Sequence, residues 1–214
     1  MKSNITFSSL IIFLFFNSIA LAQSGSLDPS FADSGIFKYD SYVWQELPVA
    51  FTVTPDGKML FVDSHNNLIR YLPAGTPDTL FGANGIGLNF YNDFFPSALA
   101  IDSSNRIVVA GHRIVIAGPS YTKVVVQRYL EDGTKDLSFG EQGDVFLSLD
   151  NTNQTLIIQP DGKIVIAGKK NSDVKVFRLN DDGSTDFTFN QAGYIGFLLN
   201  TISFPFGIDI QPDG

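Results

Sequence analysis

The sequence contains no cysteine, one tryptophan, two methionines and two histidines among 214 residues. Without cysteine the chain can form no disulfide and offers no thiolate ligand to a metal. Lysine and arginine together number 14, against 22 aspartates and glutamates, so the formal net charge is −8. Because an acidic chain is repelled by phosphate backbones and by anionic lipids, we expect neither nucleic acid nor a membrane surface as a partner.

Long hydrophobic runs are scarce as well. The clearest one, Leu10 to Phe16, has seven residues and is interrupted by Asn17-Ser18. A membrane span needs about 20 apolar residues, so this run predicts no permanent anchor. Lys2 precedes it and the small-residue pattern Ala20-Leu21-Ala22 follows it, an order typical of a cleaved secretory signal peptide.

We therefore expect a signal peptide over residues 1–22 and a mature chain over 23–214 that is secreted or displayed at the cell surface. Cleavage removes Lys2 and changes the net charge to −9. No cysteine follows the cleavage point to carry a lipid. After removal of the signal, no membrane insertion is expected.

Glycine and phenylalanine, by contrast, are abundant, with 19 and 20 residues. Both recur in a Gly-x-x-Asp-x-x-Phe phrase whose leading glycines lie 50, 58 and 50 residues apart, and a second glycine follows each phenylalanine by four residues. Such a long period indicates a repeat architecture. The phrases begin the repeat units and are Gly25–Phe31, Gly75–Phe81, Gly133–Phe139 and Gly183–Phe189.

A second phrase follows in each unit. Pro-Asp-Gly occurs at residues 55–57, 160–162 and 212–214, and Asp102 to Arg106 stands at that place in the second unit. Proline presets the first turn position and glycine accepts a left-handed conformation, so these phrases predict tight β-hairpins. Alternating or continuous apolar runs flank them, as in Lys58 to Val62 and Ile164 to Ala167, and these predict strands.

The predicted fold is therefore all-β, with propeller-like repeats of about 50 residues and four antiparallel strands in each blade. Residues after the signal show no convincing helical spacing. A β-solenoid usually has shorter repeats, and a β-sandwich has no such period. Because the given sequence stops at Pro212-Asp213-Gly214, the last repeat is expected to be incomplete. Either more protein follows, or the start and end of the chain pair to complete one blade; the usual number of about four to eight blades favours a longer protein.

The run Gln159-Pro160-Asp161-Gly162-Lys163-Ile164-Val165-Ile166-Ala167-Gly168, together with the Gly-Ser-x-Asp-x-x-Phe-Gly phrases, resembles the delta-60 repeat of exported bacterial proteins. The resemblance spans Gly25 to Gly214. It implies propeller-like repeats in a secreted or surface protein. It implies no catalytic residue, because none is assigned in that family.

Two departures from the phrase bear on the structure. Asn190 replaces the glycine that follows the phenylalanine, and it is a candidate for a left-handed conformation. In the second unit Ile107–Gly111 is nearly duplicated as Ile114–Gly118. The duplication lengthens a hairpin or forms a loop beside the blade, and the sequence leaves both options open.

The repeated aspartates are the first candidate site. Carboxylates at fixed positions could line a calcium site. The alternative is that each one accepts backbone N–H bonds in a short turn while the phenylalanine three residues later fills the core; the sequence favours this alternative. The four aspartates are Asp28, Asp78, Asp136 and Asp186.

The remaining candidates are few. His65 and His112 lie in different units without a repeated carboxylate or nucleophile beside them, and Trp44 with Tyr39 and Tyr42 could form a sugar-binding platform or belong to a core. We therefore assign no catalytic residue, no cofactor and no metal ligand.

Two main functions remain, and a third possibility is a stalk or spacer that carries other domains and has no pocket. The first is a non-enzymatic structural or binding module, which presents loops to a protein or glycan ligand and is joined by further blades or domains of a longer chain. The alternative is an extracellular propeller enzyme, a lyase or hydrolase acting on glycans with residues such as His112 at the channel mouth. Converging polar groups in a pocket would favour the enzyme.

Overall fold

The computed structural model describes residues 27–29, 31, 35–36, 49–82, 86–90, 94–115, 121–150, 153–198 and 207–211. The predicted signal peptide and the aromatic residues Tyr39, Tyr42 and Trp44 lie outside these ranges. The described residues form strands and turns without a helix, so none of these residues belongs to a helix able to cross a membrane.

The described strands form three antiparallel sheets of four, which confirms the predicted all-β fold. In each sheet, neighbours in space are also neighbours in sequence. The strands are β1 (Ala50–Val53), β2 (Met59–Val62), β3 (Asn67–Tyr71), β4 (Ile86–Asn89), β5 (Phe94–Ile101), β6 (Ile107–Val115), β7 (Tyr121–Tyr129), β8 (Asp144–Leu147), β9 (Thr155–Ile158), β10 (Ile164–Lys170), β11 (Asp173–Leu179) and β12 (Tyr194–Leu198).

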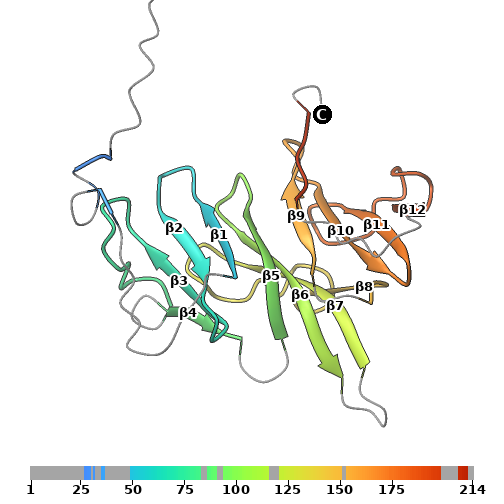
Figure 1. The fold of residues 1–214 in the computed structure, drawn as a ribbon, viewed down its shortest axis with the longest axis horizontal. Coiled ribbons are helices and arrows are strands. Elements are labelled where there is room, and N and C mark those ends of the chain that lie inside the picture. Colours follow the sequence, from blue (N-terminus) through green and yellow to red (C-terminus); the bar gives the residue numbers. More distant parts are fainter. Residues whose placement is uncertain are drawn as a thin grey trace, which may run out of the picture.

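The three sheets follow one another side by side in chain order (Figure 1). The first strand of each sheet contacts the first strand of the next, because β1 packs on β5 and β5 packs on β9. A succession of four-stranded up-and-down sheets whose first strands adjoin is the arrangement of propeller blades. We therefore call the three sheets blades 1, 2 and 3.

The blades are offset from the sequence repeats. The repeat that starts at Gly133 contributes β8 to blade 2 and then β9, β10 and β11 to blade 3. The phrase with the repeated aspartate consequently lies in the loop between the third and fourth strands of a blade. Each sheet thus combines three strands of one repeat with one strand of the next.

Two apolar clusters fill the spaces between neighbouring blades. Alternate residues of each strand face opposite neighbours, and the β-branched residues of the middle strands pack well on such a pleated surface. Between blades 1 and 2 lie Leu60, Val62, Leu68, Phe81, Phe90, Phe94, Leu99, Ile107, Val109, Val125 and Tyr129. Between blades 2 and 3 lie Val108, Ala110, Val124, Val126, Phe139, Leu147, Leu149, Leu156, Ile164, Ile166, Phe177 and Leu179.

The first hairpin of every blade closes with the same turn. In blade 1 the N–H of Thr54 donates to the carbonyl of Lys58 at 2.8 Å, and Gly57 has φ = 81°. Blade 2 has no glycine at that position, and Asn105 takes its place with φ = 60°. Asparagine tolerates this left-handed conformation better than most residues, so the turn is kept without the Pro-Asp-Gly phrase.

The near-duplication in the second repeat lengthens a hairpin. Strands β6 and β7 have nine residues each and pair along their whole length, from Ile107 opposite Tyr129 to Val115 opposite Tyr121. The equivalent strands of blade 3 have seven residues. Of the two options open at the sequence level, the described residues Ile114 and Val115 support the longer hairpin, while residues 116–118 of the duplicated segment lie outside the described ranges.

Candidate functional site

An arginine on the third strand of each blade pairs with the repeated aspartate eight residues later. The Nε–Oδ2 distance is 2.9 Å between Arg70 and Asp78, 2.7 Å between Arg128 and Asp136, and 2.6 Å between Arg178 and Asp186. These arginines are site residues that the sequence patterns above did not indicate. The constant spacing of eight residues was the available signal.

The other carboxylate oxygen of each aspartate holds the turn that follows. Oδ1 of Asp136 accepts hydrogen bonds from the N–H of Ser138 at 3.0 Å and from its hydroxyl at 2.6 Å. Asp186 receives the same two bonds from Thr188, and Asp78 receives one from the N–H of Leu80. These three aspartates therefore have the turn role that the sequence favoured over a calcium site.

Asp28 differs from the other three. It is exposed, and eight residues before it stands Ala20 rather than an arginine. Within the described ranges no group of three or more histidine, aspartate or glutamate side chains is placed to hold a metal ion.

The repeated phenylalanine lies under the same arginine. The guanidinium carbon lies 4.3 Å from the ring centroid of Phe81 in blade 1, 4.7 Å from that of Phe139 in blade 2 and 4.6 Å from that of Phe189 in blade 3. Such cation–π contacts contribute about 0.5–2 kcal/mol each, depending on their desolvation. Phe81 and Phe139 are fully buried, which confirms their predicted place in the core, whereas Phe189 is half-buried.

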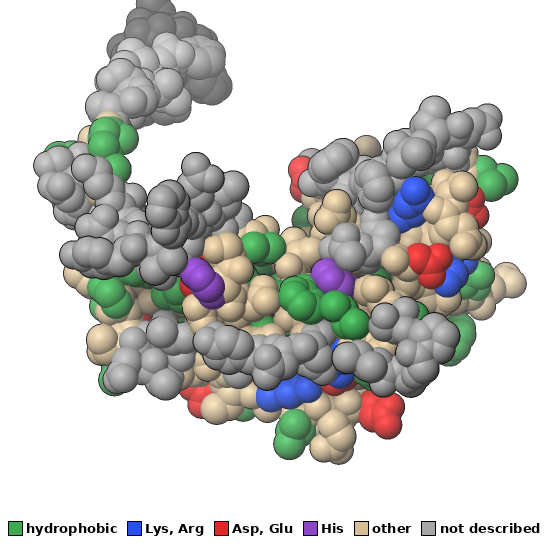
Figure 2. All heavy atoms as spheres, turned by 60° about the horizontal axis from the view of Figure 1, so that its bottom comes forward, with side chains coloured by type: hydrophobic (Ala, Val, Ile, Leu, Met, Phe, Trp, Pro, Cys, Tyr) green, Lys and Arg blue, Asp and Glu red, His purple; other side chains and the backbone are tan. Residues whose placement is uncertain are grey.

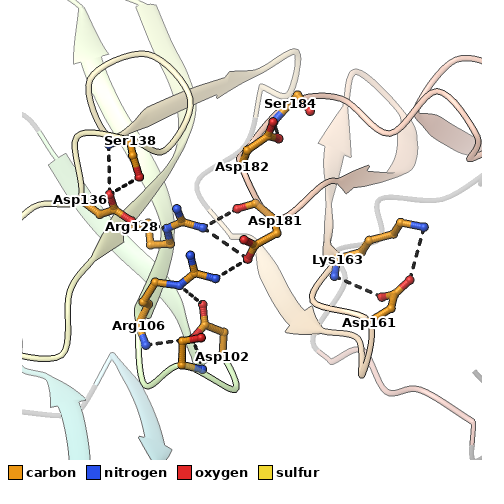
Figure 3. A network of polar contacts seen from close by, with 11 residues as sticks. Asp102, Arg106, Arg128, Asp136, Ser138, Asp161, Lys163, Asp181, Asp182 and Ser184 are labelled. Atoms are coloured by element: carbon orange, nitrogen blue, oxygen red, sulfur yellow. Dashed lines mark hydrogen bonds and ion pairs between the residues drawn. The ribbon is translucent and has the colours of Figure 1, made fainter.

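The arginine also ties its blade to the next one. Nη1 of Arg128 donates a hydrogen bond to the backbone carbonyl of Asp181 in blade 3, and Arg70 donates in the same way to Glu131 in blade 2. Figure 3 shows Arg128 pointing across the gap toward Asp181 while its Nε side faces Asp136. A backbone bond accompanies it, from the N–H of Gly140 to the carbonyl of Asp182 at 2.8 Å.

A second cation converges on the same acidic turn. Arg106, on the first hairpin of blade 2, binds the carboxylate of Asp181 in Figure 3. In blade 1, Nζ of Lys58 lies 3.6 Å from Oε1 of Glu131, the residue equivalent to Asp181. We call this arrangement the junction: two cations of one blade that hold the acidic residue two positions before the turn glycine of the next.

The turn glycine itself lies against the preceding blade. Gly183 has φ = 86°, and a Cβ placed on it would lie 2.9 Å from Cε2 of Phe139 and 2.8 Å from Cγ2 of Val145. The leading glycine of the repeat is thus required both by the turn and by close packing between blades.

Hydrogen bonds in the aspartate turns lower the pKa values of Asp136 and Asp186. Burial raises the pKa of Asp136, but hydrogen bonds from Ser138 and Arg128 outweigh it, so the net shift is downward. For Asp186 the hydrogen bond from the Thr188 hydroxyl is the largest cause, and with the Arg178 contact it lowers the pKa to about 2. Both groups are therefore carboxylates at neutral pH and accept, rather than donate, protons in these bonds.

The two histidines do not come together. Figure 2 shows the histidine side chains as two separate patches on one face. His65 is exposed in the turn between β2 and β3, whereas His112 is half-buried on β6, where its ring stacks on Phe95 with centroids 5.0 Å apart. Burial lowers the pKa of His112, so the neutral imidazole is favoured there. Its Nδ1 atom is buried without a hydrogen-bond partner.

A polar cluster that the sequence did not indicate surrounds Asp144. Its carboxylate accepts bonds from Gln127 at 2.7 Å, Lys135 at 2.6 Å and Arg113 at 3.2 Å. Because donors from β6, β7 and the following loop occupy both oxygens, the cluster joins these elements.

The fold and the repeated junction define the chain as a β-propeller-like repeat protein. Residues 103–139 and 159–189 match the family described as a domain of unknown function (DUF5122) beta-propeller, which supports a propeller-like repeat family. Both matched segments run from the first hairpin turn to the phenylalanine under the arginine, so they include the junction cations of blades 2 and 3. No curated protein matches the chain.

Proposed function

We propose that the chain is a non-enzymatic structural or binding module of a secreted or cell-surface protein, and that its repeats are delta-60 repeats. It presents the loops of a propeller-like scaffold to a protein or glycan. The resemblance of the repeated phrases to the delta-60 repeat supports the family, and the N-terminal signal pattern supports the location. The exposed side chains of the loops support the binding role.

The observation that carries the binding role is an exposed apolar side chain in the same loop of every described blade. In the loop between the third and fourth strands, Leu80 is 88 % exposed, Leu137 60 % and Phe187 68 %. Scattered exposed apolar residues are ordinary, but their recurrence in one loop of each blade places them along one rim. Apolar and aromatic side chains in such positions are typical anchors of a bound partner.

The charged groups beside these loops favour binding over catalysis. Asp78, Asp136 and Asp186 are each held by an arginine and by the following turn. A carboxylate fixed by several donors, as Asp186 is with a pKa of about 2, is a poor general base near neutral pH.

The test uses the chain secreted by its source organism. We expect its first residue to be Gln23 by mass spectrometry. The labelled mature chain should bind saturably to the cell-envelope or extracellular polysaccharide fraction of that organism without releasing sugar or peptide products. The variant with Leu80→Ser, Leu137→Ser and Phe187→Ser should keep its unfolding temperature and lose most of this binding.

Tyr121→Ser is the matched control, because Tyr121 is an exposed ring away from the rim. Binding that survives the triple variant but is lost in the control would refute the rim as the binding surface. Progressive release of sugar products by the purified chain would refute the non-enzymatic role and favour the glycan-active alternative.

A further inference from the structure

The forward face of a blade is the side that packs on the next blade in chain order, and in blade 3 it differs from the first two. In blades 1 and 2 its apolar residues are completely buried: Leu60 and Leu68 in blade 1, Val108 and Val126 in blade 2. The equivalents in blade 3, Val165 and Val176, are half-buried. The side-chain exposure of the junction arginine follows the same order, with 8 % for Arg70, 3 % for Arg128 and 20 % for Arg178.

The two cations of the forward face remain in place in blade 3. Lys163 and Arg178 stand where Arg106 and Arg128 stand in blade 2. There the pair holds the acidic turn of the next blade. In blade 3 both turn back to their own blade: Lys163 lies 3.6 Å from Asp186, and Nη2 of Arg178 lies 3.3 Å from the hydroxyl of Thr188.

A short segment already lies on this face. Residues 207–211 follow blade 3, and Ile210-Gln211 corresponds in the repeat to Ile158-Gln159 at the end of β9. The segment and blade 3 line an open pocket of about 250 Å³, with Ile208 and Ile210 on one side and Val165, Arg178 and Phe189 on the other. This segment, which corresponds in the repeat to the end of a first strand, thus covers the face only in part.

We propose that the forward face of blade 3 is a docking surface for the remaining strands of a fourth blade. Residues 207–211 form the first strand of that blade. A turn in it, with an acidic residue followed by Asp-Gly, binds Lys163 and Arg178. The occupant is polypeptide continuous with residues 207–211. Its recognition combines apolar burial over Val165 and Val176 with a carboxylate and a backbone carbonyl for the two cations.

Charge argues against a second copy of the chain as the occupant. A head-to-tail copy would present the turn of blade 1, Pro73-Ala74-Gly75, which has no carboxylate at the position of Glu131 and Asp181. The acidic turns of blades 2 and 3 are already bound within the chain. A second copy therefore offers these cations no free acidic turn from the described blades.

The test extends the full chain. Residues 1–212 are followed by an added copy of residues 161–198, which supplies three strands and the Asp181-Asp182-Gly183 turn. We expect amides of β10 and β11 to exchange at least about tenfold more slowly than in the original chain, because local opening then exposes less surface. The matched control carries Asp181→Lys in the added copy only, and it should lose most of this protection.

The arginine supplies a second measurement. Arg178→Ala should lower the unfolding temperature several times more in the extended chain than in the original one. Equal effects in both chains would overturn the proposal, as would added residues that exchange like unfolded chain. Concentration-dependent dimerisation of the original chain that Lys163→Glu and Arg178→Glu abolish would also overturn it, because the occupant would then be a second copy.

Discussion

The guanidinium of Arg128 lies over the ring of Phe139, donates to the carboxylate of Asp136 and reaches a backbone carbonyl of Asp181 in the next blade. One side chain thus connects the aspartate turn, the core and the neighbouring blade. Its side chain is 3 % exposed, so these contacts are formed away from water, where an unpaired partner is costly.

Removing this arginine should be strongly destabilising. We expect Arg128→Ala to lower the free energy of unfolding by about 3–5 kcal/mol, since it leaves the buried carboxylate of Asp136 without its cation. Arg128→Lys should recover only part of this loss, because an ammonium cannot make the planar, multidentate contacts. Urea denaturation followed by circular dichroism measures both. A loss below about 1 kcal/mol for Arg128→Ala, as for an exposed ion pair, would contradict the structural role.

Two glycines with the same backbone conformation allow a matched comparison. Gly183 and Gly162 have φ of 86° and 83°, but an added Cβ clashes only at Gly183, while at Gly162 its nearest neighbour is Asp181 at 3.9 Å. Gly162→Ala should cost about 1–2 kcal/mol from the left-handed conformation alone. Gly183→Ala should cost about 1–3 kcal/mol more from overpacking. Equal losses in thermal unfolding would show that the blades do not pack closely at Gly183.

The carboxyl of Asp186 should titrate far below ordinary aspartates. Its folded pKa of about 2 lies under the value near 3.9 expected of an unfolded chain. The stabilisation it provides is therefore complete above about pH 4 and is lost as the pH falls toward 2. Thr188→Ala removes the largest cause and should raise the pKa of Asp186 in a carbon-detected NMR titration.

The control for this titration is Ser184→Ala. Ser184 bonds Asp182 rather than Asp186, so this change should raise the pKa of Asp182 and leave Asp186 unaffected. A Thr188→Ala variant with an unchanged Asp186 titration would mean that the backbone N–H of residue 188 and the arginine contact determine the shift without the hydroxyl.

The turn of blade 2 should tolerate glycine better than alanine at residue 105. Asn105 has φ = 60°, a conformation that costs an ordinary residue about 1–2 kcal/mol and glycine very little. We expect Asn105→Ala to lower the free energy of unfolding by about 1 kcal/mol and Asn105→Gly to change it by less than that, measured by thermal unfolding. Ser103→Ala, an exposed change in the same turn, serves as the control; a loss there as large as for Asn105→Ala would remove the conformational explanation.

Sequence patterns predicted the local elements well because turn chemistry is local. The hairpin turns at residues 55–57 and 160–162, the core positions of Phe81 and Phe139 and the turn role of Asp78, Asp136 and Asp186 are confirmed. Asn190 was a candidate for the left-handed conformation and has φ = 51°. The glycines at the same place in the other repeats, Gly82 and Gly140, have φ of 55° and 53°.

The contacts between blades could not be predicted in the same way. Arg128 looks like an ordinary residue of a strand, and its partner at residue 181 is brought to it only by the packing of two blades. The offset between repeat and blade also escapes a periodicity argument, since a period of 50 residues is the same wherever the unit is said to begin.

That offset has a consequence for how such proteins can grow. A duplicated repeat carries one strand that completes the preceding sheet, as β8 does, and three strands whose sheet is completed by a strand of the next repeat, as β9 to β11 are by β12. The first strand of each added repeat therefore forms main-chain hydrogen bonds with the sheet of the preceding repeat. Lengthening by whole repeats keeps every earlier sheet intact, whereas a deletion that starts inside a blade leaves a sheet open.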